Sequence, residues 1–322
     1  MEKRVREALK TVKLEPYGRP GGGCINEGSG YMTDKGPVFV KFNRKKEARQ
    51  MFDGEQDSLK ALYATRTIRV PKPLAVFDLD GGGAAFAAEY IDMGGSGSSH
   101  SAMLGTNLAR LHLYNAELLK KAEERASWVK TEPFEDDDDI SILEPVTQFG
   151  FASTTCCGYI PQQNGWMGNW IEFYAQNRLK AQVDLLVSKG SGKGELQELW
   201  EQLQRRLPSL FSDLPEGGKS ITPALLHGDL WGGNVSATKE EPVIFDPATF
   251  YGHSEFEFGI ATMFGGCFDR RFYDAYHALI PETAGFKRRL PLYQLFHYLN
   301  HWSHHGGAYK SQSLSLLRKL TK

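Results

Sequence analysis

Asp229, Asn234 and Asp246 carry oxygen donors within the segment Leu225–Pro247, whose sequence is LLHGDLWGGNVSATKEEPVIFDP. Asp229 follows Gly228, and a glycine there allows a loop to present the carboxylate without steric obstruction. An Asp, then an Asn, then a second Asp after an apolar strand is the order in which kinase-like folds place a catalytic carboxylate and two Mg²⁺ ligands. The same residue types are common in ordinary loops, so this segment alone leaves both interpretations open.

The second half of the segment predicts a β-hairpin. Val235–Ala237 and Val243–Asp246 are short apolar runs separated by a polar turn. A turn centred on Glu240 places Asn234 opposite Asp246 at the open end of the hairpin. Two oxygen ligands with no cysteine nearby suit a hard cation such as Mg²⁺.

The N-terminal part contains a Gly-rich loop at 17–28, followed by a predicted hairpin with strands at 29–32 and 38–42. Glycines allow backbone N–H groups to approach phosphates closely. Lys41 lies in the second strand. It is either an edge lysine whose ammonium group reaches solvent or the phosphate-pairing lysine of a kinase small lobe.

A predicted helix at 45–63 favours the kinase interpretation. Four apolar residues mark one face of this helix: Met51, Phe52, Leu59 and Leu62. Glu55 lies in the middle of the same face, where an unpaired carboxylate would be costly. Lys41 on the preceding strand is the nearest plausible partner, and a strand lysine held by a helix glutamate is a kinase arrangement.

The rest of the chain predicts strands at 74–78 and 84–90, a small-residue connector at 94–99, and mostly helices thereafter. The predicted helices are at 2–12, around 104–112, and at 170–186, 196–207, 255–264 and 290–305. His112 is expected to pack or cap rather than to catalyse. The acidic run at 132–145 is predicted to be a solvated surface insertion rather than a metal site.

The last predicted helix, 290–305, buries Leu292, Leu295, Phe296 and Leu299. His301, His304 and His305 near its end could form a zinc site or a polar helix end. The second interpretation is favoured because no cysteine or acidic residue is adjacent.

Composition excludes several classes of protein. Of the 322 residues, 41% are hydrophobic and 24% charged, with a formal net charge of −1, as in an ordinary globular protein with no basic surface for nucleic acid. No apolar run has the length of a membrane span, and the charged N-terminus does not resemble a secretory signal. The four cysteines show no metal-ligand spacing, which favours the cytoplasm.

Several motifs in order resemble the fructosamine-3-kinase/ketosamine-3-kinase family, which belongs with the aminoglycoside-phosphotransferase-like kinases. They are GGGCI at 21–25, GPVFVK at 36–41, ARQMFDGE at 48–55, TTCCGYIPQ at 154–162, LLHGDLWGGNV at 225–235, FDPATFYGHSEFE at 245–257 and YQLFHYLNHW at 293–302. The resemblance covers nearly the whole chain except the acidic run. It implies an α+β, bilobal protein-kinase-like fold. The small antiparallel-sheet lobe would span 1–92, and the larger, mostly helical lobe 93–322.

The resemblance also implies an activity: ATP- and Mg²⁺-dependent phosphorylation of the third-carbon hydroxyl of a ketosamine, which leads to deglycation of protein lysines. Asp229 would be the catalytic base, and Asn234 and Asp246 would bind Mg²⁺. The ATP site would comprise Gly22, Gly23, Cys24, Lys41 and Glu55, with Glu89, Tyr90 and Ile91 as the adenine-binding hinge. Trp231, His301 and Trp302 are candidate substrate contacts, although Trp231 could equally be a core residue.

Two other functions are weighed against this one. A kinase for aminoglycosides, choline or another small hydroxyl compound would share the motifs. A nucleotide-binding module without activity is disfavoured because Lys41, Asp229, Asn234 and Asp246 are all present. Glycated proteins or small ketosamines are the expected partners. LWGGNV with PVIF resembles the ketosamine branch, for which ribulosamine and psicosamine are the expected substrates, with fructosamine as a further candidate.

Cys24 is also a candidate redox switch. Three glycines precede it in a loop that must admit nucleotide, and exposed N–H groups there stabilise a thiolate. Oxidation would suppress ATP binding or join two chains through Cys24, so the chain is expected to be a monomer or a redox-sensitive homodimer. The alternative is a small loop residue that Ser could replace.

Overall fold

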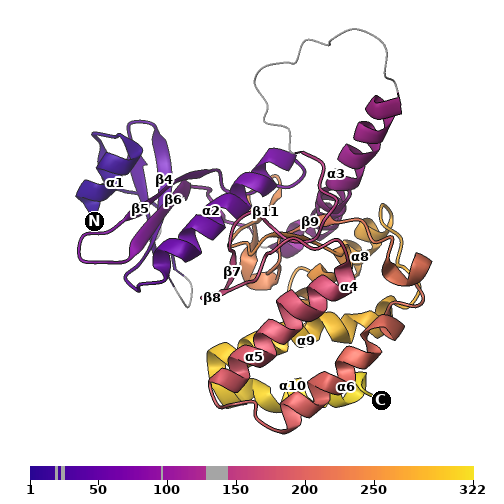
Figure 1. Ribbon diagram of the computed structural model, residues 1–322. Coiled ribbons are helices and arrows are strands. Elements are labelled where there is room, and N and C mark those ends of the chain that lie inside the picture. Colours follow the sequence, from indigo (N-terminus) through magenta and orange to yellow (C-terminus); the bar gives the residue numbers. More distant parts are fainter. Residues whose placement is uncertain (19–20, 23–25, 96, 128–143) are drawn as a thin grey trace.

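The computed structural model describes residues 1–18, 21–22, 26–95, 97–127 and 144–322, with the backbone alone at 21–22 (Figure 1). It confirms an α+β, kinase-like fold in which a small sheet-containing lobe stands beside a larger helical one. The placement of the boundary between residues 92 and 93 stays a prediction. The acidic run at 132–143, together with Gly23 and Cys24, lies outside the described residues.

An antiparallel sheet forms the N-terminal lobe, with strand order β1-β3-β4-β6-β5 and β2 paired to β3. Its strands are β1 (Leu14–Pro16), β2 (Gly21–Gly22), β3 (Glu27–Thr33), β4 (Gly36–Asn43), β5 (Pro73–Asp78) and β6 (Ala84–Glu89). Because β4 is paired on both sides, with β3 and with β6, Lys41 is not on a sheet edge. The edge-lysine alternative is therefore wrong.

Two helices pack against this sheet. α1 (Glu2–Leu9) is shorter than predicted because Lys10 takes a left-handed conformation that ends the helix. α2 (Ala48–Thr65) buries Met51, Phe52, Leu59 and Leu62, as its periodicity predicts.

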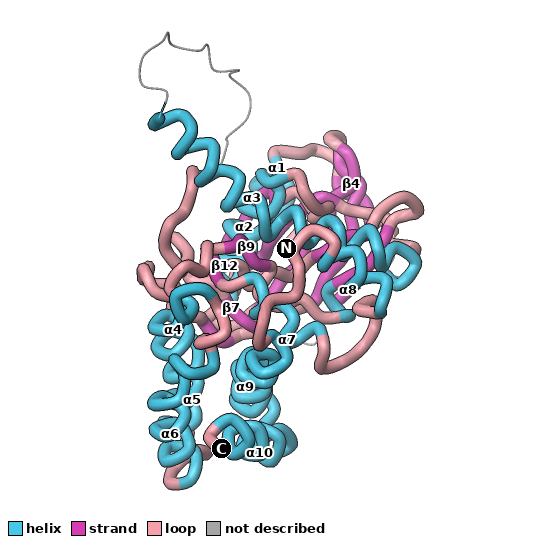
Figure 2. Tube along the Cα trace, turned by 90° about the vertical axis from the view of Figure 1, so that its right-hand side faces the viewer, coloured by secondary structure: helices cyan, strands magenta, loops and turns pink. Residues whose placement is uncertain are grey.

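Helices dominate the second lobe, and α4, α5, α6, α9 and α10 gather at the end remote from the sheet (Figures 1 and 2). They surround one hydrophobic core, while a second core lies between α2, α3 and α8. The α-helices are α3 (Ser101–Ser127), α4 (Trp170–Phe173), α5 (Ala181–Ser188), α6 (Glu195–Leu210), α7 (Phe258–Ala261), α8 (Arg270–His277), α9 (Phe286–His305) and α10 (Lys310–Leu320).

Shorter elements connect these helices, and several of them carry polar side chains of the site described below. A π-helical turn, Tyr174–Lys180, joins α4 to α5. The 3-10 turns are η1 (Gly97–His100), η3 (Pro215–Gly218), η4 (Gly232–Asn234), η5 (Ser254–Glu257) and η6 (Gly306–Tyr309). The strand pairs are β7 (Cys156–Cys157) with β8 (Ile160–Pro161), β9 (Ala224–Leu226) with β12 (Phe250–Gly252), and β10 (Val235–Ala237) with β11 (Pro242–Ile244).

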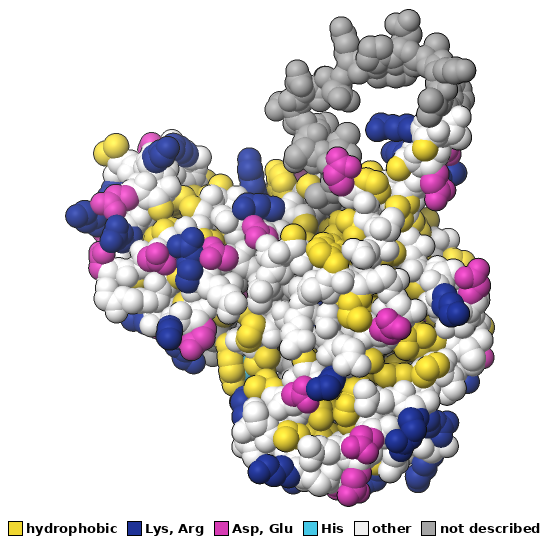
Figure 3. Space-filling model, in the orientation of Figure 1, with side chains coloured by type: hydrophobic (Ala, Val, Ile, Leu, Met, Phe, Trp, Pro, Cys, Tyr) yellow, Lys and Arg dark blue, Asp and Glu magenta, His cyan; other side chains and the backbone are white. Residues whose placement is uncertain are grey.

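The surface shows no segregation of charge on the face in Figure 3, where basic and acidic side chains are interspersed. Such a mixture differs from the continuous basic surface that nucleic-acid binding requires. In the described part of the chain, none of the helices combines the length and the apolar composition of a membrane span.

Candidate active site

Lys41 lies at the junction of the two lobes. Its Nζ is 2.6 Å from a carboxylate oxygen of Glu55 on α2 and also pairs with Asp246, which follows β11. Burial alone would lower the pKa of Lys41, but the two carboxylates outweigh burial and raise it, so the ammonium form persists. The predicted Lys41–Glu55 pair is thus present, and Lys41 links it to the second lobe.

The hairpin register differs by one residue from the prediction. Val235 pairs with Ile244, so Asn234 lies opposite Phe245 and not opposite Asp246. The prediction was wrong because the turn is centred between Lys239 and Glu240.

Asn234 and Asp246 are nevertheless close. Asp246 has a left-handed backbone (φ 57°), and its carbonyl oxygen is 3.5 Å from Nδ2 of Asn234. Nδ2 also donates to the carbonyl of Asp229 at 2.8 Å, which leaves Oδ1 of Asn234 as the atom available to a cation. A carboxylate and an amide oxygen form a donor set that fits Mg²⁺.

Asp229 lies in the loop that follows β9. Gly228 has φ 84°, and a Cβ there would lie 2.2 Å from the carbonyl oxygen of Ala248, so this close approach requires glycine. His227 accepts the Asp229 N–H at Nδ1 and donates from Nε2 to the Phe245 carbonyl. Burial and the neighbouring Asp246 and Glu257 carboxylates raise the pKa of Asp229 to about 7.

Glu257 in η5 holds the loop of Asp229 through hydrogen bonds to its backbone. Its two carboxylate oxygens accept the backbone N–H groups of His227 (2.7 Å) and Gly228 (2.9 Å). His112, whose Nδ1 hydrogen-bonds with the Tyr276 hydroxyl, lies 3.5 Å from the same carboxylate. His112 is thus a packing residue, as predicted. Glu257 was not predicted as a site residue, although an acidic residue between Phe256 and Phe258 was a signal for a buried partner.

The predicted hinge begins at the last residue of β6. The Glu89 carboxylate is 2.5 Å from the Arg69 guanidinium and accepts the Lys72 N–H, while the Tyr90 ring packs against Tyr17. Ile91 is buried. Of the predicted Gly-rich contacts, Gly22 lies in β2 opposite Glu27, and Gly23 and Cys24 fall outside the described residues.

The three candidate substrate contacts separate into two groups. Trp231 is 36% exposed and its ring meets Phe264, which in turn packs on His301. Trp302 is 3% exposed within the hydrophobic core, because it continues the buried stripe of Leu295 and Leu299 on α9. The prediction for Trp302 is therefore wrong, and Phe264 is an aromatic neighbour that the prediction missed.

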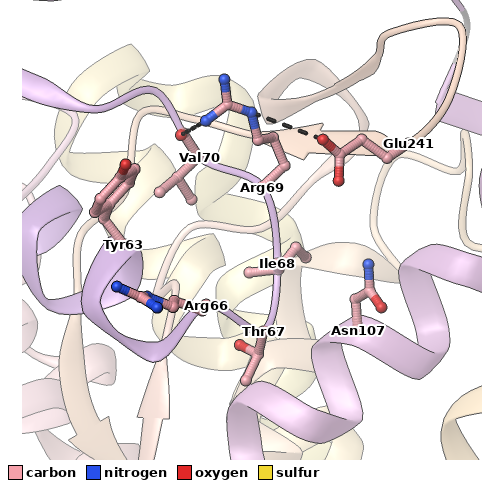
Figure 4. A pocket seen from close by; sticks show the side chains of 8 residues that line it. All are labelled: Tyr63, Arg66, Thr67, Ile68, Arg69, Val70, Asn107 and Glu241. Carbon is pink, nitrogen blue, oxygen red and sulfur yellow. Dashed lines mark hydrogen bonds and ion pairs between the residues drawn. The ribbon is translucent and has the colours of Figure 1, made fainter. Parts of the chain in front are cut away.

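A separate groove lies between the end of α2 with the segment that follows it, α3, and the β10–β11 turn (Figure 4). None of the carboxylates described above lines it. Arg69 there is 3.8 Å from Glu241, in addition to its contact with Glu89, so it ties the N-terminal sheet to the β10–β11 turn. The groove therefore contains a contact between the two lobes, formed by Arg69, and does not contain the reactive groups.

The site brings together a half-buried lysine, two oxygen donors for a cation, and a carboxylate of raised pKa. This arrangement can position an anionic phosphate next to a group that accepts a proton from a hydroxyl. Sequence comparison agrees with this chemistry. The profile of the fructosamine kinase family matches residues 2–123 and 141–322 and omits most of the acidic run.

Individual relatives cover the whole chain. A ketosamine-3-kinase of Mus musculus is 51% identical over 322 residues, which is 100% of both chains. A chloroplastic protein-ribulosamine 3-kinase of Arabidopsis thaliana is 38% identical over 96% of this chain and 83% of its own length.

Solved structures share the fold. A protein of Haemophilus somnus 129PT, provisionally named a fructosamine-3-kinase, aligns with a TM-score of 0.76 at 23% identity over 99% of this chain and 97% of its own. An aminoglycoside phosphotransferase aligns with a TM-score of 0.58 at 11% identity over 100% of this chain and 98% of its own. The chain belongs to the fructosamine kinase family and is a phosphotransferase.

Proposed function

We propose that this kinase transfers a phosphoryl group from ATP to the third-carbon hydroxyl of protein-bound or small ketosamines, with ribulosamine and psicosamine as substrates and fructosamine as a further candidate. The observation that carries the proposal is the position of Lys41, which contacts both Glu55 and Asp246 beside the Asp229 loop. The family and its 51%-identical ketosamine-3-kinase relative support the substrate class. The unstable 3-phosphate would then break down and release the lysine, which is protein repair.

Each residue has a distinct role in this proposal. Lys41, held by Glu55, pairs with the phosphates of ATP, and Asp229 accepts the proton of the sugar hydroxyl as that oxygen attacks phosphorus. A carboxylate with a pKa of about 7 is a competent acceptor near neutral pH. Asn234 and Asp246 would hold Mg²⁺, which when bound neutralises charge on the phosphate oxygens. The backbone at Glu89, Tyr90 and Ile91 would bind adenine, and the loop with Gly22, Gly23 and Cys24 would cover the phosphates.

Acceptor specificity tests this proposal. The protein is incubated with Mg²⁺-ATP and lysines carrying ribulosamine, psicosamine or fructosamine, and sugar phosphate is measured. Aminoglycosides and choline serve as competing acceptors. Phosphorylation of ketosamines alone is expected; turnover of choline or an aminoglycoside without that of any ketosamine would reject the proposed substrate class.

Trp231 is proposed to offer its ring to the sugar–amine unit. Trp231→Ala is expected to raise KM for the ketosamine roughly 2- to 10-fold, the value of one aromatic contact, and to leave KM for ATP unchanged. Trp231→Phe should retain most of the affinity. Trp166→Ala is a matched control, because Trp166 is 41% exposed but packs near Tyr251. Equal KM values for Trp231→Ala and the control would exclude this contact.

Glu257 is proposed to position the catalytic loop. In Glu257→Gln only one oxygen remains, so one buried N–H, of His227 or Gly228, loses its acceptor at about 1–3 kcal/mol. We expect a lower melting temperature and a kcat reduced roughly tenfold. Glu282→Gln, the same change at an exposed residue, should alter neither. A wild-type kcat in Glu257→Gln would show that the loop does not depend on this carboxylate.

Location and redox control belong to the same proposal. The enzyme is proposed to act in the cytoplasm as a monomer or as a homodimer linked through Cys24. Kinase assays of the wild type and Cys24→Ala with and without dithiothreitol, together with non-reducing gels, test this switch. A wild-type enzyme without reductant dependence and without a linked species would dismiss it.

A further inference from the structure

A thiol, a carboxylate and an imidazole converge beside the catalytic loop. Cys157 on β7, Asp229 after β9 and His297 on α9 each offer one ligand atom, and these atoms all lie within 4.8 Å of one another. Within the described ranges, no other group of three such residues has this spacing. The three come from separate elements, so the fold and not the local sequence assembles them.

His297 gives a second, independent observation that points to a ligand. Its side chain is fully buried, and neither ring nitrogen has a hydrogen-bond partner among the residues that the structure describes. Buried polar groups without a partner are rare and destabilising. Burial lowers the pKa of His297 well below its ordinary value, so the ring is neutral and has a free lone pair, the form that binds a metal.

A chain of hydrogen-bonded side chains contacts the sulfur of Cys157. Nδ2 of Asn300 donates to Sγ of Cys157 at 3.1 Å. The side-chain oxygen Oδ1 of Asn300 accepts from Nε2 of Gln182, and Oε1 of Gln182 accepts from the Ser303 hydroxyl, both at 3.3 Å. This chain fixes the Asn300 amide with its donor toward sulfur. Outer hydrogen bonds of this kind orient metal ligands and support a thiolate.

Arg178 supplies charge in the same region. Its guanidinium is fully buried and, in the described part of the chain, forms no ion pair with a carboxylate. It donates to backbone and amide oxygens and stacks on Phe250. Burial and the Asp229 charge raise the pKa of the Cys157 thiol, whereas the Arg178 charge lowers it. A thiolate at Cys157 would therefore be stabilised by the charge of Arg178, to which the described residues offer no carboxylate partner.

We propose that Cys157, Asp229 and His297 form a binding site for a thiophilic divalent metal ion such as Zn²⁺, and that this ion inhibits the kinase by occupying the Asp229 carboxylate. The inhibitory effect rests on the proposed function, whereas the binding does not. One sulfur, one nitrogen and one oxygen ligand suit Zn²⁺, with water in the fourth position. On binding, the Cys157 thiol releases its proton to solvent, and the two anionic ligands balance the charge of the ion.

This site differs in chemistry from the proposed Mg²⁺ site. Asn234 and Asp246 offer oxygen only, whereas sulfur and imidazole select against Mg²⁺. Ligands of a tetrahedral zinc ion lie roughly 3.5 Å apart, given metal–ligand distances of about 2.0–2.3 Å. The observed spacing therefore requires only a small inward movement of the three side chains. Excess Mg²⁺-ATP should not relieve inhibition by Zn²⁺, but a chelator that binds Zn²⁺ and leaves Mg²⁺ free should.

Cobalt titration of the full-length enzyme tests the site without using activity. Co²⁺ replaces Zn²⁺ and reports a thiolate ligand through a charge-transfer band and tetrahedral coordination through intense visible bands. We expect one equivalent bound by the wild type, and at least about 100-fold weaker binding in Cys157→Ser and in His297→Gln, because loss of even an outer-shell partner costs 10- to 100-fold. Cys156→Ser, a change at the adjacent half-buried thiol, is the matched control and should bind like the wild type.

The outcomes separate the two proposals. Absence of a thiolate band in the wild type, or an equal loss in Cys156→Ser and Cys157→Ser, would overturn the site. The two ligand variants are independent, and the wild-type spectrum decides the question if either fails to fold. Cobalt bound with the expected signature, together with zinc that displaces it but has no effect on phosphoryl transfer, would overturn the inhibition and would count against Asp229 as the base.

Discussion

Asp229→Asn is expected to lower kcat by roughly 10²–10⁴-fold, the usual contribution of general acid–base catalysis. The amide has the shape of the carboxylate but cannot accept the hydroxyl proton. The Asp229 side chain lies 3.5 Å from Nδ2 of Asn234, and Lys41 contacts Asp246 and Glu55 instead. The substitution should therefore leave KM for ATP close to that of the wild type.

Steady-state kinetics with a ribulosamine-modified lysine measures this effect. Asp184→Asn makes the same chemical change on α5, at an exposed ion pair with Lys180, and should retain full activity. A kcat near that of the wild type in Asp229→Asn would remove Asp229 from its role. A fall in ATP affinity without a fall in kcat would place the residue in nucleotide binding instead.

Sequence patterns predicted those site residues whose burial follows from the periodicity of a single helix or strand. Glu55 interrupts the apolar face of one helix, and Lys41 lies on the strand before it, so burial itself demanded their pairing. The helix faces of α2 and α9 followed from the same periodicity. The hairpin register was wrong by one residue because turn length, which sets register, is not readable from a run of polar residues.

The remaining site residues depend on contacts between distant segments. Glu257 contacts the catalytic loop although it lies 30 residues from His227 in the sequence. His297 on α9 lies close to Asp229. The position of Glu257 between two phenylalanines indicates a buried partner but does not say which one, and nothing in the local sequence of His297 distinguishes a site residue from a core residue. Trp302 shows the converse, since it is adjacent to His301 in sequence, but one helical residue turns the side chain by about 100° and Trp302 is buried in the core. Such placements are set by tertiary packing.

Arg289→Met is expected to reduce the free energy of unfolding by about 3–5 kcal/mol, the range for breaking a buried ion pair by removing one partner. Arg289 is 0% exposed, and two of its nitrogens each lie 2.7 Å from a Glu255 carboxylate oxygen. Burial alone would raise the pKa of Glu255, but the hydrogen bonds from Arg289 outweigh it and lower that pKa. The stabilisation is thus present above the ordinary glutamate pKa and declines as pH falls through the folded-state value.

Urea unfolding at neutral pH measures the loss, and the Arg318→Met variant supplies the comparison. Arg318 forms a similar pair with Glu195, but both side chains are about half exposed, so its removal should cost less than about 1 kcal/mol. The double variant Arg289→Met/Glu255→Leu should recover much of the lost stability, because no uncompensated charge remains buried. Since Glu255 lies two residues before Glu257, Arg289→Met should also lower kcat by loosening the carboxylate that holds the catalytic loop. Equal destabilisation by Arg289→Met and Arg318→Met would show that burial does not strengthen the pair.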